Sequence, residues 1–139
     1  MNSTASGFIP YEMKTSIIRI TGYDKKELRG TLSNPYFGDD VFFDNVIQLL
    51  MLVEELLDSL HFPQRAMESR SFRKIEGEAS ALPATEEQKN ARALATFKLN
   101  VLFRQGASWQ GRLVWVDQKS EAQFRSVLEL LKLIDNVLS

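Results

Sequence analysis

Two neighbouring stretches decide the fold: TFKLNVLFR, residues 96–104, and SWQGRLVWVD, residues 108–117. Side chains alternate between the two faces of a β-strand, and both stretches alternate apolar with polar residues, with Leu102 as an exception. Residues 105–107 (QGA) supply a turn between them, so we predict an antiparallel hairpin. Its apolar face is expected to carry Phe97, Leu99, Val101, Phe103, Trp109, Leu113 and Trp115.

A second hairpin is predicted near the N-terminus. SIIRITGY, residues 16–23, and ELRGTLSN, residues 27–34, are rich in strand-forming residues and are separated by the turn-like Asp24-Lys25-Lys26. Residues 34–40 (NPYFGDD) then collect turn formers. These patterns place a hairpin and a turn before the long apolar run that follows.

Each hairpin is followed by a predicted helix. The apolar run Val41–Leu60 is interpreted as a helix with Asp39 or Asp40 as its N-cap. The second helix is expected to open with a capping box at residues 120–123 (SEAQ) and to run to the C-terminus. Both halves of the chain therefore read strand, strand, helix.

The two halves also match residue by residue. A shift of 81 positions places 17–58 on 98–139 without a gap, and it puts Gly30 on Gly111. We therefore predict an internal repeat with units 16–60 and 96–139, joined by a polar linker at about 75–93, in a single domain spanning 1–139. The alternative is that any two leucine-rich amphipathic helices can be slid into register.

Two ββα units predict an α+β fold. We expect a two-layer sandwich in which a four-stranded antiparallel sheet carries two long helices on one face. The same order is compatible with a circularly permuted ferredoxin-like pattern. Half of such a unit has too little buried surface to fold alone, so a single-copy relative is expected to dimerise.

Composition excludes several classes of protein. The 139 residues are 44% hydrophobic and 25% charged with a formal net charge of -1, which is typical of a globular protein and predicts no bulk attraction to polyanions. The chain has no cysteine and one histidine, His61, which excludes thiol chemistry and multi-histidine metal sites. No catalytic motif is present, so we expect no enzyme, no cofactor and no metal.

Localisation is predicted from two segments. Residues 1–7 lack the basic start and apolar run of a secretory signal, which favours a cytoplasmic protein. Residues 41–60 have the length of a membrane span but include Glu54, Glu55 and Asp58. We therefore expect a buried helix and no membrane association.

The helices carry more apolar residues than one sheet face requires. An amphipathic helix that covers a sheet needs an apolar arc of roughly 100°. One interpretation is that the two helices simply pack on each other. The other is an interface with a protein partner or with a second copy in a homodimer, for which the candidates are Phe42, Leu49, Met51, Leu52 and Leu56.

A nucleic-acid-binding accessory protein is the alternative function. Basic and aromatic residues alternate in the segment 62–74, and further basic residues fall on the polar face of the predicted second hairpin. Trp109 and Trp115 could stack on a base, but they fall on the apolar face of the predicted hairpin and are therefore expected in the core. The candidate anion or nucleic-acid contacts are Arg65, Arg70, Arg73, Lys98, Arg104 and Arg112.

The end of the chain resembles a known group of sequences. Trp109-Gln110-Gly111, followed by residues 124–130 (FRSVLEL), is similar to the final strand and helix of a family of small uncharacterised bacterial proteins. The resemblance covers about the last 45 residues and extends loosely to the first half. It implies that the last two strands and the helix form one unit, and it implies no activity or substrate.

Overall fold

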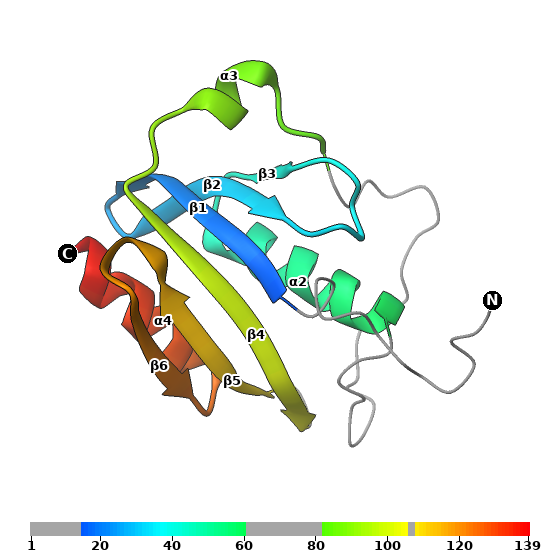
Figure 1. Cartoon of the computed structure of the whole chain (residues 1–139), viewed down its shortest axis with the longest axis vertical. Helices are drawn as coiled ribbons and strands as arrows, with labels where there is room; N and C mark the ends of the chain where they lie inside the picture. The colour runs from blue at the N-terminus through cyan, green and yellow to red at the C-terminus, as the bar shows by residue number, and fades with distance from the viewer. Residues whose placement is uncertain (1–14, 61–81, 106–107) are drawn as a thin grey trace.

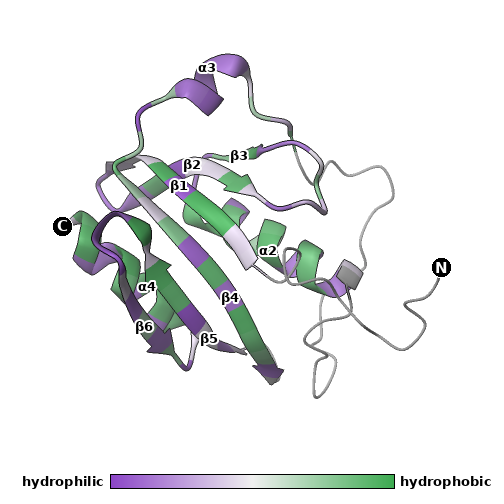
Figure 2. Cartoon of the chain, in the orientation of Figure 1, coloured by the Kyte–Doolittle hydropathy of each residue, from purple (hydrophilic) through white to green (hydrophobic). Residues whose placement is uncertain are grey.

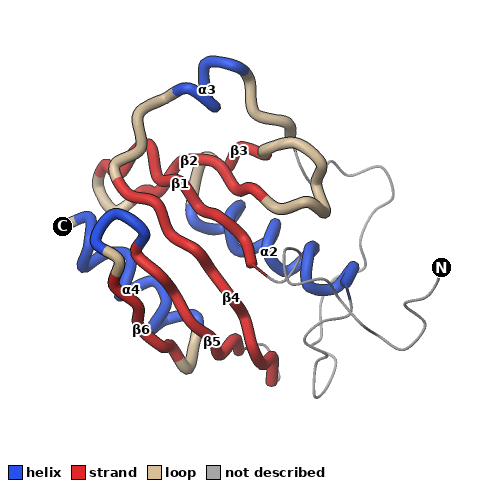
Figure 3. The backbone as a smooth tube through the Cα atoms, in the orientation of Figure 1, coloured by secondary structure: helices blue, strands red, loops and turns tan. Residues whose placement is uncertain are grey.

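The computed structural model describes residues 15–60, 82–105 and 108–139, and it forms a single six-stranded sheet (Figures 1 and 3). The strand order is β3-β2-β1-β4-β5-β6, and every neighbouring pair is antiparallel. The strands are β1 (Thr15–Asp24), β2 (Glu27–Ser33), β3 (Val41–Phe43), β4 (Ala95–Gln105), β5 (Ser108–Trp115) and β6 (Ser120–Phe124). The α+β class is confirmed, but the predicted four-stranded sheet is wrong.

Two long helices lie behind the sheet in Figure 1, α2 (Val46–Leu60) and α4 (Val127–Leu138). The short helix α3 (Glu86–Asn90) lies between α2 and β4 in the chain, and the 3-10 helix η2 (Val116–Gln118) lies between β5 and β6. The Arg19 guanidinium holds the α3 segment by donating to the carbonyl oxygens of Lys89 at 3.0 Å and Ala91 at 2.7 Å. Part of the predicted polar linker is thus an ordered helix.

One core joins both halves of the chain. The inner face of the sheet and the inner faces of α2 and α4 contribute to the same apolar cluster, and Figure 2 shows the apolar stripes of the strands and helices. Because large apolar side chains stabilise a fold when they leave water, this shared cluster ties both helices to one sheet. Its most completely buried large side chains are Trp109, Phe43, Phe97, Phe124, Ile18, Ile20, Leu32, Ile134 and Val53.

The two additional strands lie where the sequence predicted the first turn of each helix. Residues 41–43 form β3 and residues 120–124 form β6. The predicted N-caps Asp39, Asp40 and Ser120 are therefore wrong. A short apolar run such as Val-Phe-Phe fits a strand and a helix turn equally well, because three residues are too few to show a period.

The true caps lie a few residues later. Asn45 Oδ1 accepts from the Gln48 amide at 2.9 Å, and Ser126 Oγ accepts from the Glu129 amide at 3.1 Å. The Gln48 side chain in turn accepts from the Asp44 amide, and the Glu129 side chain accepts from the Arg125 amide. These reciprocal bonds resemble a capping box.

A bulge in β4 changes which side chains face the core. The pairing of β4 with β5 shifts between Val101 and Phe103, so the alternation predicted for this strand fails beyond Val101. Phe103 is consequently 63% exposed, while Arg104 is buried beside Trp109 on the inner face. The prediction that Phe103 is a core residue is therefore wrong.

Strand pairings recur at the 81-residue spacing found in the sequence. Gly30 pairs with Ile20 and Phe43, and Gly111 pairs with Val101 and Phe124. A Cβ at either glycine would lie about 2 Å from a backbone carbonyl oxygen, 1.9 Å from that of Arg19 and 2.1 Å from that of Asn100. Both glycines are required because the neighbouring strand passes too close for any side chain.

Candidate functional site

The five predicted interface residues separate into two groups. Leu49, Leu52 and Leu56 are at most 4% exposed, so these three belong to the core. Phe42 is half-buried in β3, and Met51 is 67% exposed on α2. The exposed apolar residues of the helix layer are Ile47, Met51 and Leu128.

The predicted basic residues do not form one patch among the described residues. Arg65, Arg70, Arg73 and His61 lie outside the described residues. Lys98 is exposed on the outer face of β4, and Arg112 on β5 lies 3.8 Å from a carboxylate oxygen of Glu121. Arg104 lies on the opposite face from Lys98, because the β4 bulge turns it inward.

Arg104 joins the second hairpin to α2. Its guanidinium lies 3.0 Å from Glu54 and 2.9 Å from Asp58, and only 4% of the side chain is exposed. The Trp109 indole N–H donates to the other oxygen of Glu54. Because a buried guanidinium must be paired, this cluster fixes the hairpin against the helix of the other half.

A corresponding contact joins the first hairpin to α4. Tyr23 lies 81 positions before Arg104, and Asp135 lies 81 positions after Glu54. The Tyr23 hydroxyl donates to Asp135 Oδ1, and the Lys26 ammonium lies 2.8 Å from the same oxygen. Each hairpin therefore makes its polar contact with the helix of the opposite half.

The electrostatics of this second contact follow from its hydrogen bonds. Donation by Lys26, Tyr23 and Ser139 lowers the pKa of the Asp135 carboxyl to about 2. The hydrogen bond to Asp135 raises the pKa of the Tyr23 hydroxyl above its ordinary value. Asp135 is therefore ionised at neutral pH, and Tyr23 is a neutral donor.

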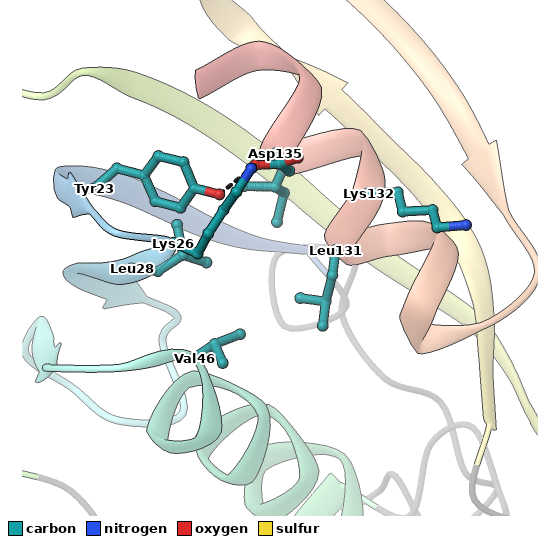
Figure 4. A pocket seen from close by; sticks show the side chains of 8 residues that line it. Tyr23, Lys26, Leu28, Val46, Leu131, Lys132 and Asp135 are labelled. Carbon is teal, nitrogen blue, oxygen red and sulfur yellow. Dashed lines mark hydrogen bonds and ion pairs between the residues drawn. The ribbon is translucent and has the colours of Figure 1, made fainter. Parts of the chain in front are cut away.

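A cleft opens beside this contact, between the first hairpin and the two helices (Figure 4). Its volume is about 240 Å³. Tyr23 and Lys26 point toward Asp135 at one side, Leu131 points into the space between the helices, and Val46 lies at the start of α2. The cleft is lined by Tyr23, Lys26, Leu28, Val46, Leu131, Lys132, Ile134 and Asp135.

The two hairpins carry side chains of different size at the position next to the cleft. Leu28 pairs with Tyr23 in the first hairpin, and Trp109 pairs with Arg104 at the position 81 residues later. Trp109 is 1% exposed and reaches Glu54 on α2, whereas Leu28 is too short to reach Asp135 on α4. Leu28 is 4% exposed and lines the cleft, while Trp109 lies at the corresponding place under α2.

The chemistry available in the cleft favours binding. The lining combines the apolar Leu28, Val46, Leu131 and Ile134 with the polar trio of Tyr23, Lys26 and Asp135. Among the described residues, no group of three His, Cys, Asp or Glu side chains could hold a metal ion. A cleft of about 240 Å³ is below the roughly 300–1,000 Å³ of small-molecule sites, but it exceeds the roughly 150 Å³ that accommodates a benzene ring.

Sequence reasoning missed Tyr23, Lys26 and Asp135. The available signal was the 81-residue shift, which aligns polar Tyr23 with Arg104 and acidic Glu54 with Asp135. Polar residues that recur at matching positions within apolar strands and helices indicate a shared contact.

No protein-family model, curated protein or solved structure matches this chain. In the part of the chain that the structure describes, no helix is long and apolar enough to cross a membrane.

Proposed function

We propose that this protein is a non-enzymatic interaction module and that the cleft between the first hairpin, α2 and α4 receives an apolar side chain of a partner protein. The observation that carries the proposal is the cleft of about 240 Å³ beside Leu28, whose counterpart in the second hairpin is the larger, fully buried Trp109. A cleft with an apolar floor and a polar rim is typical of the pockets that receive anchor side chains in protein complexes.

The surroundings of the cleft support a protein partner. Ile47, which follows Val46 of the cleft, is 60% exposed, and Leu128, one helical turn before Leu131, is 61% exposed. With Met51 on α2, these residues give the helix layer an apolar surface next to the cleft. Exposed apolar residues that gather around a pocket mark interaction sites more often than scattered ones do.

The test uses single amino acids as probes. N-acetyl amides of phenylalanine and leucine are titrated into the labelled protein while backbone amide shifts are followed by NMR. We expect saturable shifts at Leu28, Val46 and Leu131, which line the cleft, and none with the N-acetyl amide of alanine, because a methyl group leaves the space unfilled.

Leu28→Trp is the matched variant, because the fold already accepts tryptophan at the corresponding position, Trp109. The indole should occupy the cleft and abolish the shifts while the rest of the spectrum remains that of a folded protein. Undiminished shifts in this variant, or none in the wild type, would refute the proposal.

A second copy of this chain is one partner that the proposal allows. Light scattering at high protein concentration measures self-association, and Met51→Glu places a charge on the exposed apolar surface of α2. If the partner is a second copy, the wild type should associate and this variant should remain a monomer. A wild type that stays monomeric at every concentration would exclude the homodimer.

We also propose that the two halves are copies of one ancestral strand–strand–strand–helix unit within a single domain. The support is that pairings, bulges, close-approach glycines and helix caps recur at one spacing. Exchanging the cap segments 44–48 and 125–129, which have equal length, should leave the fold intact. An unfolded exchange variant would contradict this origin.

A further inference from the structure

The two edge strands of the sheet, β3 and β6, differ in how the described residues pair with their outer sides. At the β3 edge, the Phe42 amide donates to the Leu82 carbonyl at 3.0 Å, and the Ala84 amide donates to the Asp40 carbonyl at 2.8 Å. Pro83, which lacks an N–H, sits between these two bonds and forms an antiparallel bridge with Val41. A short extended segment, Leu82–Ala84, therefore closes this edge.

The β6 edge has the same backbone arrangement, and none of the residues that the structure describes covers it as Leu82–Ala84 covers β3. Residues of an antiparallel strand alternately direct their backbone groups toward one neighbour and then the other. The pair Arg112 and Gln123 corresponds to the pair Thr31 and Phe42, so the Gln123 amide and the Glu121 carbonyl point away from β5, like those of Phe42 and Asp40. Among the described residues, no strand pairs with this outer edge.

A groove runs beside the uncovered edge. It has a volume of about 490 Å³ and lies between the β6 end of the sheet and α4. It is lined by Gln123, Arg125, Glu129, Lys132, Leu133 and Asn136. A strand edge next to such a groove offers backbone partners and a place for alternate side chains of an added strand.

We propose that β6 binds an extended segment of a partner protein by antiparallel strand addition, with backbone bonds to the Gln123 N–H and the Glu121 carbonyl. The segment is expected to resemble Leu82-Pro83-Ala84, because the chain itself places that sequence on the corresponding edge. A proline in the middle and a small residue after it suit the edge, since the middle residue makes no backbone bond and Ala84 is 7% exposed, whereas Leu82 is 63% exposed and sets no requirement on the first residue. The groove shares Lys132 with the cleft beside Leu28, but no residue of β6 lines that cleft.

The test titrates a capped peptide of residues 82–87, Leu-Pro-Ala-Thr-Glu-Glu, into the full labelled chain at up to millimolar concentration. We expect saturable amide shifts at Glu121 and Gln123 and slowed hydrogen exchange of the Gln123 amide. Leu28→Trp, which fills the cleft, should leave this binding unchanged, so failure of the cleft proposal and failure of this one are distinguishable.

Two changes each remove one backbone bond. Gln123→Pro removes an amide that faces away from β5, and Gln123→Thr is the control that keeps it. Methylating the alanine amide of the peptide removes the donor to the Glu121 carbonyl without altering the protein, so it decides the matter if the proline variant unfolds. Each loss should weaken binding about fivefold, the usual effect of one hydrogen bond.

Three results would overturn the proposal. The first is no shift at Glu121 and Gln123 in the presence of the peptide. The second is a shift at Asp40 and Phe42 instead, which would mean that the peptide competes for the β3 edge. The third is protection of the Gln123 amide in concentrated protein without peptide, which would identify a second copy of the chain as the occupant.

Discussion

Trp109 and Leu28 occupy corresponding places beneath opposite helices, and only Trp109 reaches the carboxylate above it. The cleft lies beside Leu28, the smaller of the two side chains.

Leu28→Trp should be tolerated, because the added ring enters a cleft of about 240 Å³. Enlarging a side chain in a packed core costs about 1–3 kcal/mol, and we expect less than about 1 kcal/mol here. Chemical denaturation measures the change, and Leu32→Trp, at a fully buried position, is the control expected to lose at least about 3 kcal/mol. Equal losses in the two variants would show that no usable space lies beside Leu28.

Arg104→Ala should lower the free energy of unfolding by about 2 kcal/mol, since it removes a buried guanidinium from Glu54 and Asp58. The loss is moderate because the two carboxylates are 34% and 48% exposed and can be hydrated. Arg104→Met keeps an apolar chain of similar length and should recover part of the lost free energy of unfolding. An alanine variant as stable as the wild type would mean that the cluster does not hold the hairpin to α2.

The Asp135 carboxyl should titrate near its lowered pKa of about 2. Because the folded-state pKa lies below the unfolded value, the stabilising contribution is present above about pH 4 and is lost as the pH falls toward 2. NMR titration of the side-chain carboxyl measures the midpoint. In Lys26→Met, which removes the largest cause, the midpoint should rise toward 3.8, and an unchanged midpoint would refute the role of Lys26.

Gly30→Ala and Gly111→Ala should each lower stability by about 3 kcal/mol, because the new methyl group would meet a backbone carbonyl that cannot move aside. Gly22→Ala is the comparison: its new Cβ would meet the Arg29 side chain, which is flexible. Thermal unfolding ranks the three variants. A Gly22 variant as unstable as the other two would argue against close approach of the strands as the cause.

The central part of the fold was predictable from sequence. The four long strands alternate clearly enough to be recognised, and the turn at residues 24–26 follows from its composition. The edge strands were missed because β3 has three residues and β6 is mostly polar. The boxes Asn45-x-x-Gln48 and Ser126-x-x-Glu129 carried the information that each helix begins later.

The cleft depends on contacts that local patterns do not contain. Tyr23 and Asp135 are 112 positions apart, and their contact requires α4 to pack across the first hairpin. Arg104 was predicted on the polar face because the interruption of the alternation at Leu102 does not by itself distinguish a bulge from an exposed leucine in a regular strand. Tertiary packing therefore determines where the cleft lies, and it separates Arg104 from the other predicted basic residues of the hairpin.

The crossed contacts also determine how the molecule comes apart. Tyr23 on the first hairpin binds the second helix, and Arg104 on the second hairpin binds the first, so neither half can loosen without breaking both attachments. The chain should consequently unfold in one cooperative step, with no state in which one half survives alone. If the chain is cut between the halves, we expect the two fragments to remain associated through these two contacts.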